Sequence, residues 1–174
     1  MEQIRYLTKR NLDKSVISSL ATGHFISKHQ NILITGATGT GKSFLAQALA
    51  RRSISLGYPT KYYRVSTLLE EIKSSRLDGS YTKTLTKLSK FKLLLLDDFG
   101  ITPLTHDELN DLFELVEDRV FEGSFIITAQ LPVKQWHAYL GNQTIADAMM
   151  DRLINGSHKI ELKGPSMRQY LAKS

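Results

Sequence analysis

The sequence predicts an α/β fold with three layers, in which helices cover both faces of a central parallel sheet. Segments with strand character alternate with segments of helical periodicity along most of the chain. The runs LLLLD at 93–97 and FIIT at 125–128 are largely apolar, which is typical of strands that a parallel sheet buries on both faces. An all-α fold or a β-sandwich fits this alternation badly.

The first elements lead to a glycine-rich loop. Residues 11–22 carry apolar side chains on one side of a short helix. The segment NILITG at 31–36 is an apolar strand that stops at glycine. Residues 43–57 keep apolar side chains at helical spacing, and Gly57 followed by Pro59 ends this helix.

The rest of the chain continues the alternation. TKYYRV at 60–65 is rich in residues that favour strands. Residues 66–90 have helical character, with a break around Asp78 and Gly79. Two amphipathic helices and a last strand complete the pattern, at 105–123, 144–154 and 158–162.

Length and composition restrict the class of protein. The chain has 174 residues, enough for one domain with a core and too few for two domains of typical size. Its 41% hydrophobic and 23% charged residues exclude a disordered chain. No apolar run approaches the roughly 18 residues that a bilayer span requires, so no membrane partner is expected.

Residue types narrow the chemistry further. The absence of cysteine excludes disulfides and thiolate metal sites, and it suits the reducing cytoplasm. The five histidines lack the spacing of a metal site, so none is assigned to a metal. The net charge of +6 is compatible with a polyanionic partner.

The loop GATGTGKS fits the phosphate-binding pattern G-x-x-x-x-G-K-[ST] and lies between a strand and a helix start. Its glycines allow backbone N–H groups to surround phosphate oxygens, and the helix start adds a positive end. Lys42 is expected to reach the β- and γ-phosphates, and Ser43 to bind Mg²⁺ through its hydroxyl. The alternative is a glycine-rich turn that contains a lysine by chance. The predicted nucleotide-binding residues are Gly36, Ala37, Thr38, Gly39, Thr40, Gly41, Lys42, Ser43 and Phe44.

Two acids follow the leucine-rich strand directly. In P-loop NTPases a second buried strand lies beside the first and ends in an acid that holds Mg²⁺. We therefore expect Asp97 to hold Mg²⁺ through water. Asp98, facing the other way in an extended strand, is expected to polarise the attacking water; the alternative is a cap of a helix or turn. These motifs predict ATP and Mg²⁺ as cofactors.

With these motifs in place, the sequence resembles the AAA+ ATPases, and among them the DnaC/IstB branch. The resemblance covers nearly the whole chain, and it is carried by NILITGATGTGKSFLAQAL, LLLLDDFG, FIITAQLPVKQWHAYLGNQTIADAMMDRLI and IELKGPSMR. The stretches TAQLPVKQW and ADAMMDRL and the terminal G-x-S-x-R pattern resemble IstB more than a general helicase loader. The resemblance implies a three-layer P-loop NTPase of the AAA+ (ASCE) type, with a central parallel sheet and a reduced or absent helical lid.

The resemblance also implies a function. IstB-like proteins are helper ATPases of transposition, which form rings or helices on duplex DNA with ATP and work with a DDE transposase. It therefore implies ATP hydrolysis at subunit interfaces in the bacterial cytoplasm. It divides the single domain into a linker and helix at 1–30 and an ATP-binding domain at 31–174. Because family members usually carry a longer region ahead of the core, we expect this chain to lack part of it.

Further residue roles follow from the resemblance. Thr128 matches the sensor-1 position, which orients water near the γ-phosphate; the alternative is a β-branched residue that ends a strand. Arg152 matches the arginine finger that reaches the ATP of a neighbouring subunit. Arg168 matches sensor 2, a contact to the γ-phosphate in the same subunit. For these arginines the alternatives are a charge at a helix end and a charge near the chain end. Arg119 competes for the finger role, although its setting predicts a helix surface charge.

A basic segment lies between the two nucleotide motifs. Residues 61–92 hold eight lysines and arginines against three acids. A pair of basic helices tracks phosphates without reading bases, and the resemblance places this region along DNA inside a helical assembly. The alternative is a solvated helix face. The predicted DNA contacts are Lys73, Arg76, Lys83 and Lys87.

Three functions remain open on the sequence alone. The first is a transposition helper that assembles on duplex DNA, and the second is a DnaC-like replicative helicase loader with the same core and a preference for single strands. The third is a monomeric P-loop kinase, for which the chain offers no obvious lid or acceptor site. ATPase activity that duplex DNA stimulates, and that rises cooperatively with protein concentration, separates the assembling proteins from the kinase.

Overall fold

A five-stranded sheet forms the centre of the computed structural model, which describes residues 11–167. All neighbouring strands are parallel. The strand order is β2-β3-β4-β1-β5, with β1 at Ile32–Gly36, β2 at Thr60–Arg64, β3 at Leu93–Phe99, β4 at Ser124–Ala129 and β5 at His158–Leu162. Each predicted strand is present within one or two residues of its expected bounds.

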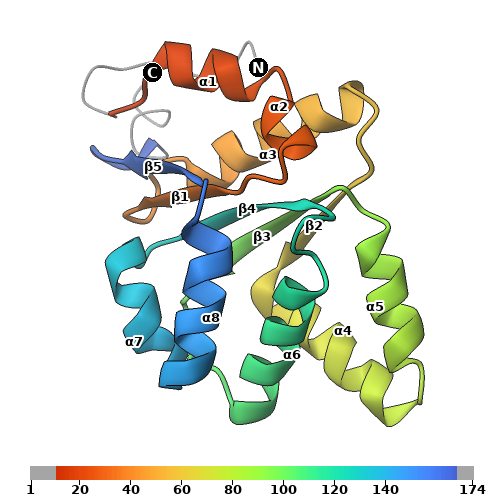
Figure 1. Ribbon diagram of the computed structural model, residues 1–174. Helices are drawn as coiled ribbons and strands as arrows, with labels where there is room; N and C mark the ends of the chain where they lie inside the picture. Colours follow the sequence, from red (N-terminus) through yellow and green to blue (C-terminus); the bar gives the residue numbers. More distant parts are fainter. Residues whose placement is uncertain (1–10, 168–174) are drawn as a thin grey trace.

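Helices cover both faces of this sheet, so the predicted three layers are confirmed (Figure 1). One face carries α1 (Lys14–Leu20), α2 (His24–Ser27) and α3 (Lys42–Ser55). The other face carries α4 (Val65–Leu77), α5 (Tyr81–Ser89), α6 (His106–Glu117), α7 (Trp136–Leu140) and α8 (Gln143–Ile154).

The leucine-rich strand β3 contributes to both cores. Leu93 and Leu95 pack with α1 to α3, whereas Leu94 and Leu96 pack with the helices of the opposite face. This division follows from the alternation of side chains along a strand. All four leucines are almost fully buried, which fixes β3 inside the sheet. The expectation that this strand lies directly beside the first one is wrong, because β4 lies between β3 and β1. Since the three strands are parallel, β3 and β1 still end on the same side of the sheet.

Helix boundaries differ from the prediction at two places. The helix expected at 11–22 is the shorter α1, and a second short helix, α2, which was not predicted, follows Gly23 with its left-handed φ of +80°. The helix expected at 105–123 ends at Glu117, and turns follow it. Apolar side chains continue beyond Glu117, so the sequence pattern predicted a longer helix than the structure has. Helix α7, which follows a 3-10 turn at Val133–Gln135, was not predicted.

The break expected inside 66–90 is confirmed. Helix α4 ends at Leu77 and α5 begins at Tyr81. Between them, the Asp78 carboxylate accepts hydrogen bonds from the backbone N–H and the hydroxyl of Ser80, at 2.9 and 2.6 Å. Gly79 has a φ of +77°. These features make α4 and α5 a helical hairpin.

The prediction that Arg119 is a helix surface charge is wrong. Its residue exposure is 1%, and its guanidinium donates hydrogen bonds to the backbone oxygens of Leu88 and Ser124, at 3.0 and 3.4 Å. Burial lowers the pKa of Arg119 to about 10. The side chain reaches inward because α6 has already ended when the chain arrives at residue 119.

Beyond β5 the described chain continues only through residues 163–167, so no helical lid domain lies within the described part. Across residues 11–167, none of the helices has the length and apolar character needed to cross a bilayer.

Candidate nucleotide-binding site

The glycine-rich loop connects β1 to α3 at the carboxyl edge of the sheet. A Cβ atom at Gly36 would lie 2.3 Å from the backbone oxygen of Leu162, and one at Gly39 would lie 2.3 Å from Oγ of Ser166. Both positions therefore require glycine. The segment after β5 also closes on the loop, because the Met167 N–H donates a hydrogen bond of 2.8 Å to the Gly39 oxygen.

Lys42 lies at the start of α3 with its side chain directed back over the loop. Its Nζ atom donates a hydrogen bond of 3.0 Å to the Ala37 oxygen. Burial lowers the pKa of Lys42, although the carboxylates of Asp98 and Asp97 oppose that shift. Lys42 is a buried residue, and it lies beside a loop whose backbone N–H groups are also donors. A bound phosphate would therefore give its ammonium further hydrogen-bond partners.

Asp97 is the centre of the polar cluster at the loop. Its residue exposure is 4%, and its Oδ1 atom accepts hydrogen bonds from the hydroxyls of Ser43, at 2.9 Å, and Thr128. The phenol of Tyr62 donates to Oδ2 at 3.1 Å. The structure therefore brings together Ser43, Asp97 and Thr128 from α3, β3 and β4.

This cluster fits a magnesium ion. The Ser43 hydroxyl and the Asp97 carboxylate are hard oxygen donors 2.9 Å apart, and Mg²⁺ prefers one or two such protein ligands together with phosphate oxygens and water. Within residues 11–167 no group of three or more histidines and acids is arranged to hold a metal. A cation here would complete its ligands with phosphate oxygens and water.

Asp98 does not have the extended conformation that was predicted for it. Its φ is +65°, in the left-handed region, and the register of β3 against β4 shifts between Leu96 and Phe99. This bulge places two residues of β3 opposite Thr128 of β4, whose Oγ1 atom accepts a 3.2 Å hydrogen bond from the Asp98 N–H. The Asp98 side chain is 43% exposed, with Nε of Arg64 at 3.9 Å.

Sequence reasoning missed the contribution of β2. Tyr62 contacts Asp97, and Arg64 lies beside Asp98. The register, in which Arg64 is opposite Asp97, produces both contacts. A single sequence gives no signal for that register, because it does not say which strand lies next to β3.

A cavity of about 380 Å³ adjoins the loop. It lies where β1, β4 and β5 end, and its lining includes Gly36, Thr40, Gln130, Pro132 and Leu162. Ligands of open α/β sheets bind in this position, outside the carboxyl ends of the strands.

Arg152 lies on the opposite side of the sheet from the loop, near the amino ends of the strands. It lines a second cavity, of about 200 Å³, together with His29, Asn31 and Phe125, which lie before or at the start of strands β1 and β4. Its guanidinium forms an ion pair with Glu117 of α6 and donates a 2.9 Å hydrogen bond to the Ala148 oxygen. Arg152 therefore does not reach the nucleotide loop of its own chain. Arg168 lies outside the described residues.

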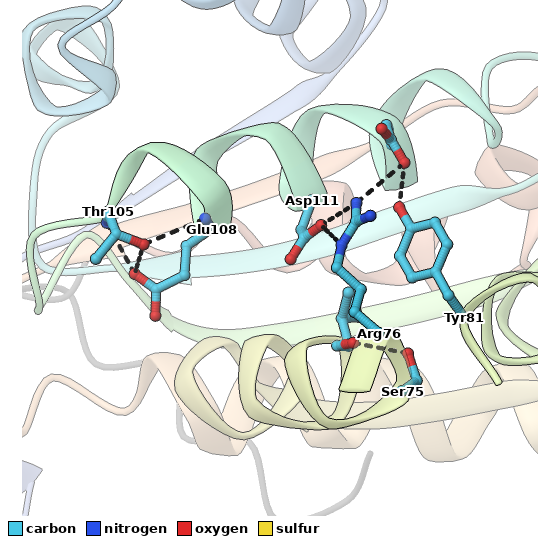
Figure 2. Close-up of polar contacts among 8 residues, drawn as sticks. Ser75, Arg76, Tyr81, Thr105, Glu108 and Asp111 are labelled. Atoms are coloured by element: carbon cyan, nitrogen blue, oxygen red, sulfur yellow. Dashed lines mark hydrogen bonds and ion pairs between the residues drawn. The ribbon is translucent and has the colours of Figure 1, made fainter. Parts of the chain in front are cut away.

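The predicted DNA-contacting residues have different environments. Lys73, Lys83 and Lys87 are exposed on the α4–α5 hairpin, and Lys87 lies 3.7 Å from Glu71. Figure 2 shows Arg76 between Asp111 of α6 and the ring of Tyr81. Its Nε atom donates a 2.8 Å hydrogen bond to Asp111, a residue with 3% exposure. Arg76 is therefore engaged within the chain.

Comparisons with known proteins place this chain in a family. Residues 1–173 match the family model described as IstB-like ATP binding protein. The relative named "Putative insertion sequence ATP-binding protein y4pL" from Sinorhizobium fredii is 40% identical over 168 residues, which are 97% of this chain and 69% of that protein.

Solved structures give the same fold. The DnaC helicase loader has a TM-score of 0.71 at 18% identity, covering 86% of this chain and 87% of its own. DnaA from Aquifex aeolicus bound to AMPPCP has a TM-score of 0.78 at 19% identity, covering 99% of this chain and 52% of its own. Together with the parallel sheet and its glycine-rich loop, these likenesses show the AAA+ P-loop fold. The chain belongs to the IstB-like ATP-binding proteins, an AAA+ family associated with insertion sequences.

Proposed function

We propose that this chain is a Mg²⁺-dependent ATPase that assists insertion sequence transposition. In this proposal it assembles on duplex DNA with ATP and directs a DDE transposase in the bacterial cytoplasm. The observation that carries the proposal is the hydrogen-bonded cluster of Ser43, Asp97 and Thr128 at the glycine-rich loop. Family membership supports ATP binding, and the printed name of the 40% identical relative supports the link to an insertion sequence.

The site's own residues divide the chemistry between them. The loop N–H groups and Lys42 bind the phosphates, and Ser43 with Asp97 would hold the magnesium ion. Mg²⁺, when bound, neutralises charge on the phosphate oxygens. Asp98 polarises the attacking water, and the Thr128 hydroxyl orients it.

Arg168 is proposed to contact the γ-phosphate of its own chain. The hydrogen bond from the preceding residue, Met167, to Gly39 supports this role because it brings the chain to the loop.

Hydrolysis is proposed to occur at interfaces between subunits. Arg152 lies at the amino edge of the sheet and the nucleotide loop at the carboxyl edge, so one chain supplies the two halves of a head-to-tail interface. An arginine from the next subunit would stabilise charge as the phosphoryl group leaves. Repetition of such an interface gives a ring or a helix.

DNA is proposed to lie along the α4–α5 hairpin. Lys73, Lys83 and Lys87 are exposed there, and lysine ammonium groups contact phosphates without reading bases. Arg76 would have to exchange Asp111 for a phosphate, so we assign the primary contacts to the three lysines.

A DnaC-like helicase loader is the second candidate function, since the fold likeness to the DnaC helicase loader covers 86% of this chain. The two candidates share the ATPase chemistry and differ in their nucleic acid. Binding of long duplexes and of single strands in the presence of ATP separates them. Preference for single strands would favour the loader.

The proposed function is tested by ATP hydrolysis measured over a range of protein concentrations, with and without long duplex DNA. The proposal predicts a specific activity that rises cooperatively with concentration and increases with duplex DNA. A specific activity that is independent of concentration and unaffected by DNA would contradict it and would favour a monomeric P-loop enzyme such as a kinase.

A further inference from the structure

Three hydroxyl groups from three different elements hold the Asp97 carboxylate. Ser43 and Thr128 donate to Oδ1, and Tyr62 alone among these donors serves Oδ2. The first two belong to positions that nucleotide chemistry explains. Tyr62 comes from β2, which the nucleotide motifs do not include.

The strand geometry accounts for this contact. Tyr62 is opposite Leu95 in the parallel register, so its side chain is on the same face of the sheet as Leu95 and, two residues on, Asp97. That face is covered by α3, which begins at Lys42 and brings Ser43 to the carboxylate. Tyr63 projects to the opposite face and packs in the other core. The two neighbouring tyrosines therefore have different roles: Tyr62 makes a polar contact, and Tyr63 packs in a hydrophobic core.

Tyr62 is placed to donate a hydrogen bond to Asp97. It is 41% exposed, so the hydrophobic core does not explain its position. A tyrosine phenol carries a hydrogen that it can donate, and here it donates to Asp97. A buried carboxylate requires such partners, and each one restricts the rotation of its oxygens.

We infer that Tyr62 is a positioning residue that holds Asp97 in the orientation that keeps its Oδ1 atom beside Ser43. The inference rests on the proposed function, because it assigns Tyr62 to the magnesium-dependent part of nucleotide binding. Partners that orient a metal ligand typically change metal affinity by about 10- to 100-fold when removed. Tyr62 acts through Asp97, so the effect should fall on the metal and not on the nucleotide alone.

The test compares Tyr62→Phe with Tyr63→Phe, which removes the same hydroxyl group from the next residue on the opposite face. Binding of AMPPCP is measured by calorimetry in EDTA and at increasing Mg²⁺, and Mn²⁺ binding to the nucleotide complex by electron paramagnetic resonance. For Tyr62→Phe we expect unchanged binding in EDTA and about a tenfold higher metal concentration for half-maximal effect. Tyr63→Phe should match the wild type, and thermal unfolding confirms that both variants are folded.

The outcomes are distinguishable. If the wild type shows metal-linked binding and Tyr62→Phe has the same metal dependence, or a tighter one, the positioning role of Tyr62 is overturned and the proposed function stands. A loss of AMPPCP binding in EDTA would also overturn it, because Tyr62 would then act on the nucleotide. If the wild type itself shows no metal-linked binding, the proposed function fails, and this inference fails with it.

Discussion

Arg152 of α8 and Glu117 of α6 form a two-point ion pair at the amino edge of the sheet. Nη2 of Arg152 lies 2.9 Å from Oε2 of Glu117, and Nε contacts the other carboxylate oxygen. This ion pair holds the side chain of Arg152, the proposed arginine finger, against α6 of the same chain. Engagement of a neighbouring nucleotide would therefore require Arg152 to exchange a carboxylate for a phosphate, both of which fit its planar guanidinium.

Arg152→Ala is expected to bind nucleotide nearly normally and to lose turnover, by about 10³-fold or more. It should also lose assembly on DNA, since the contact proposed between its guanidinium and a nucleotide crosses an interface. Nucleotide titration, steady-state hydrolysis and light scattering measure the three properties. Arg51→Ala, which removes an exposed arginine from α3, is the matched control. Full turnover in Arg152→Ala would move the finger elsewhere.

Arg119→Ala is expected to lower the free energy of unfolding by about 3 kcal/mol, because it leaves a cavity and two backbone oxygens without their donor. Arg119→Met fills the same space without a charge and should cost less. Chemical denaturation measures both. If Arg119→Ala is as stable as the wild type, the buried side chain makes no structural contribution.

Replacing both Lys73 and Lys83 by alanine is expected to weaken DNA binding. It should also reduce the slope of log affinity against log salt by the amount that about two phosphate contacts contribute. Fluorescence anisotropy with duplex DNA at several salt concentrations measures the slope. The control removes Lys14 and Lys28, exposed lysines beside the opposite face of the sheet. An unchanged slope in the test variant would remove the hairpin from the DNA interface.

Asp98→Asn is expected to retain ATP binding, since the phosphate contacts remain, and to lose hydrolysis, because the amide is a far weaker base than the carboxylate. The ATP-bound protein should then accumulate in its assembled form, and sedimentation measures that assembly. A variant that cannot bind ATP would contradict the role assigned to Asp98.

Much of this fold was predictable from the sequence, for identifiable reasons. The apolar strands and the G-x-x-x-x-G-K-[ST] loop are local patterns, so β1, α3 and β3 were placed correctly. Contacts that depend on strand order were not predictable. Tyr62 reaches Asp97 only because β2 lies next to β3.

Backbone departures from regular structure explain the remaining differences. The bulge at Asp98 and the early end of α6 both change where a side chain points, although the local sequence continues the pattern of its element. The second change is the reason that Arg119 is buried and not exposed.

The central claim is that the loop at Gly36–Ser43 and the carboxylate of Asp97 bind one metal-bound triphosphate. Calorimetric titration of the wild type and Lys42→Ala with ATP, with and without Mg²⁺, tests it most directly. The account predicts heat of binding for the wild type, tighter binding with Mg²⁺, and loss of binding in Lys42→Ala. Absence of heat in the wild type, or equal binding by Lys42→Ala, would contradict it.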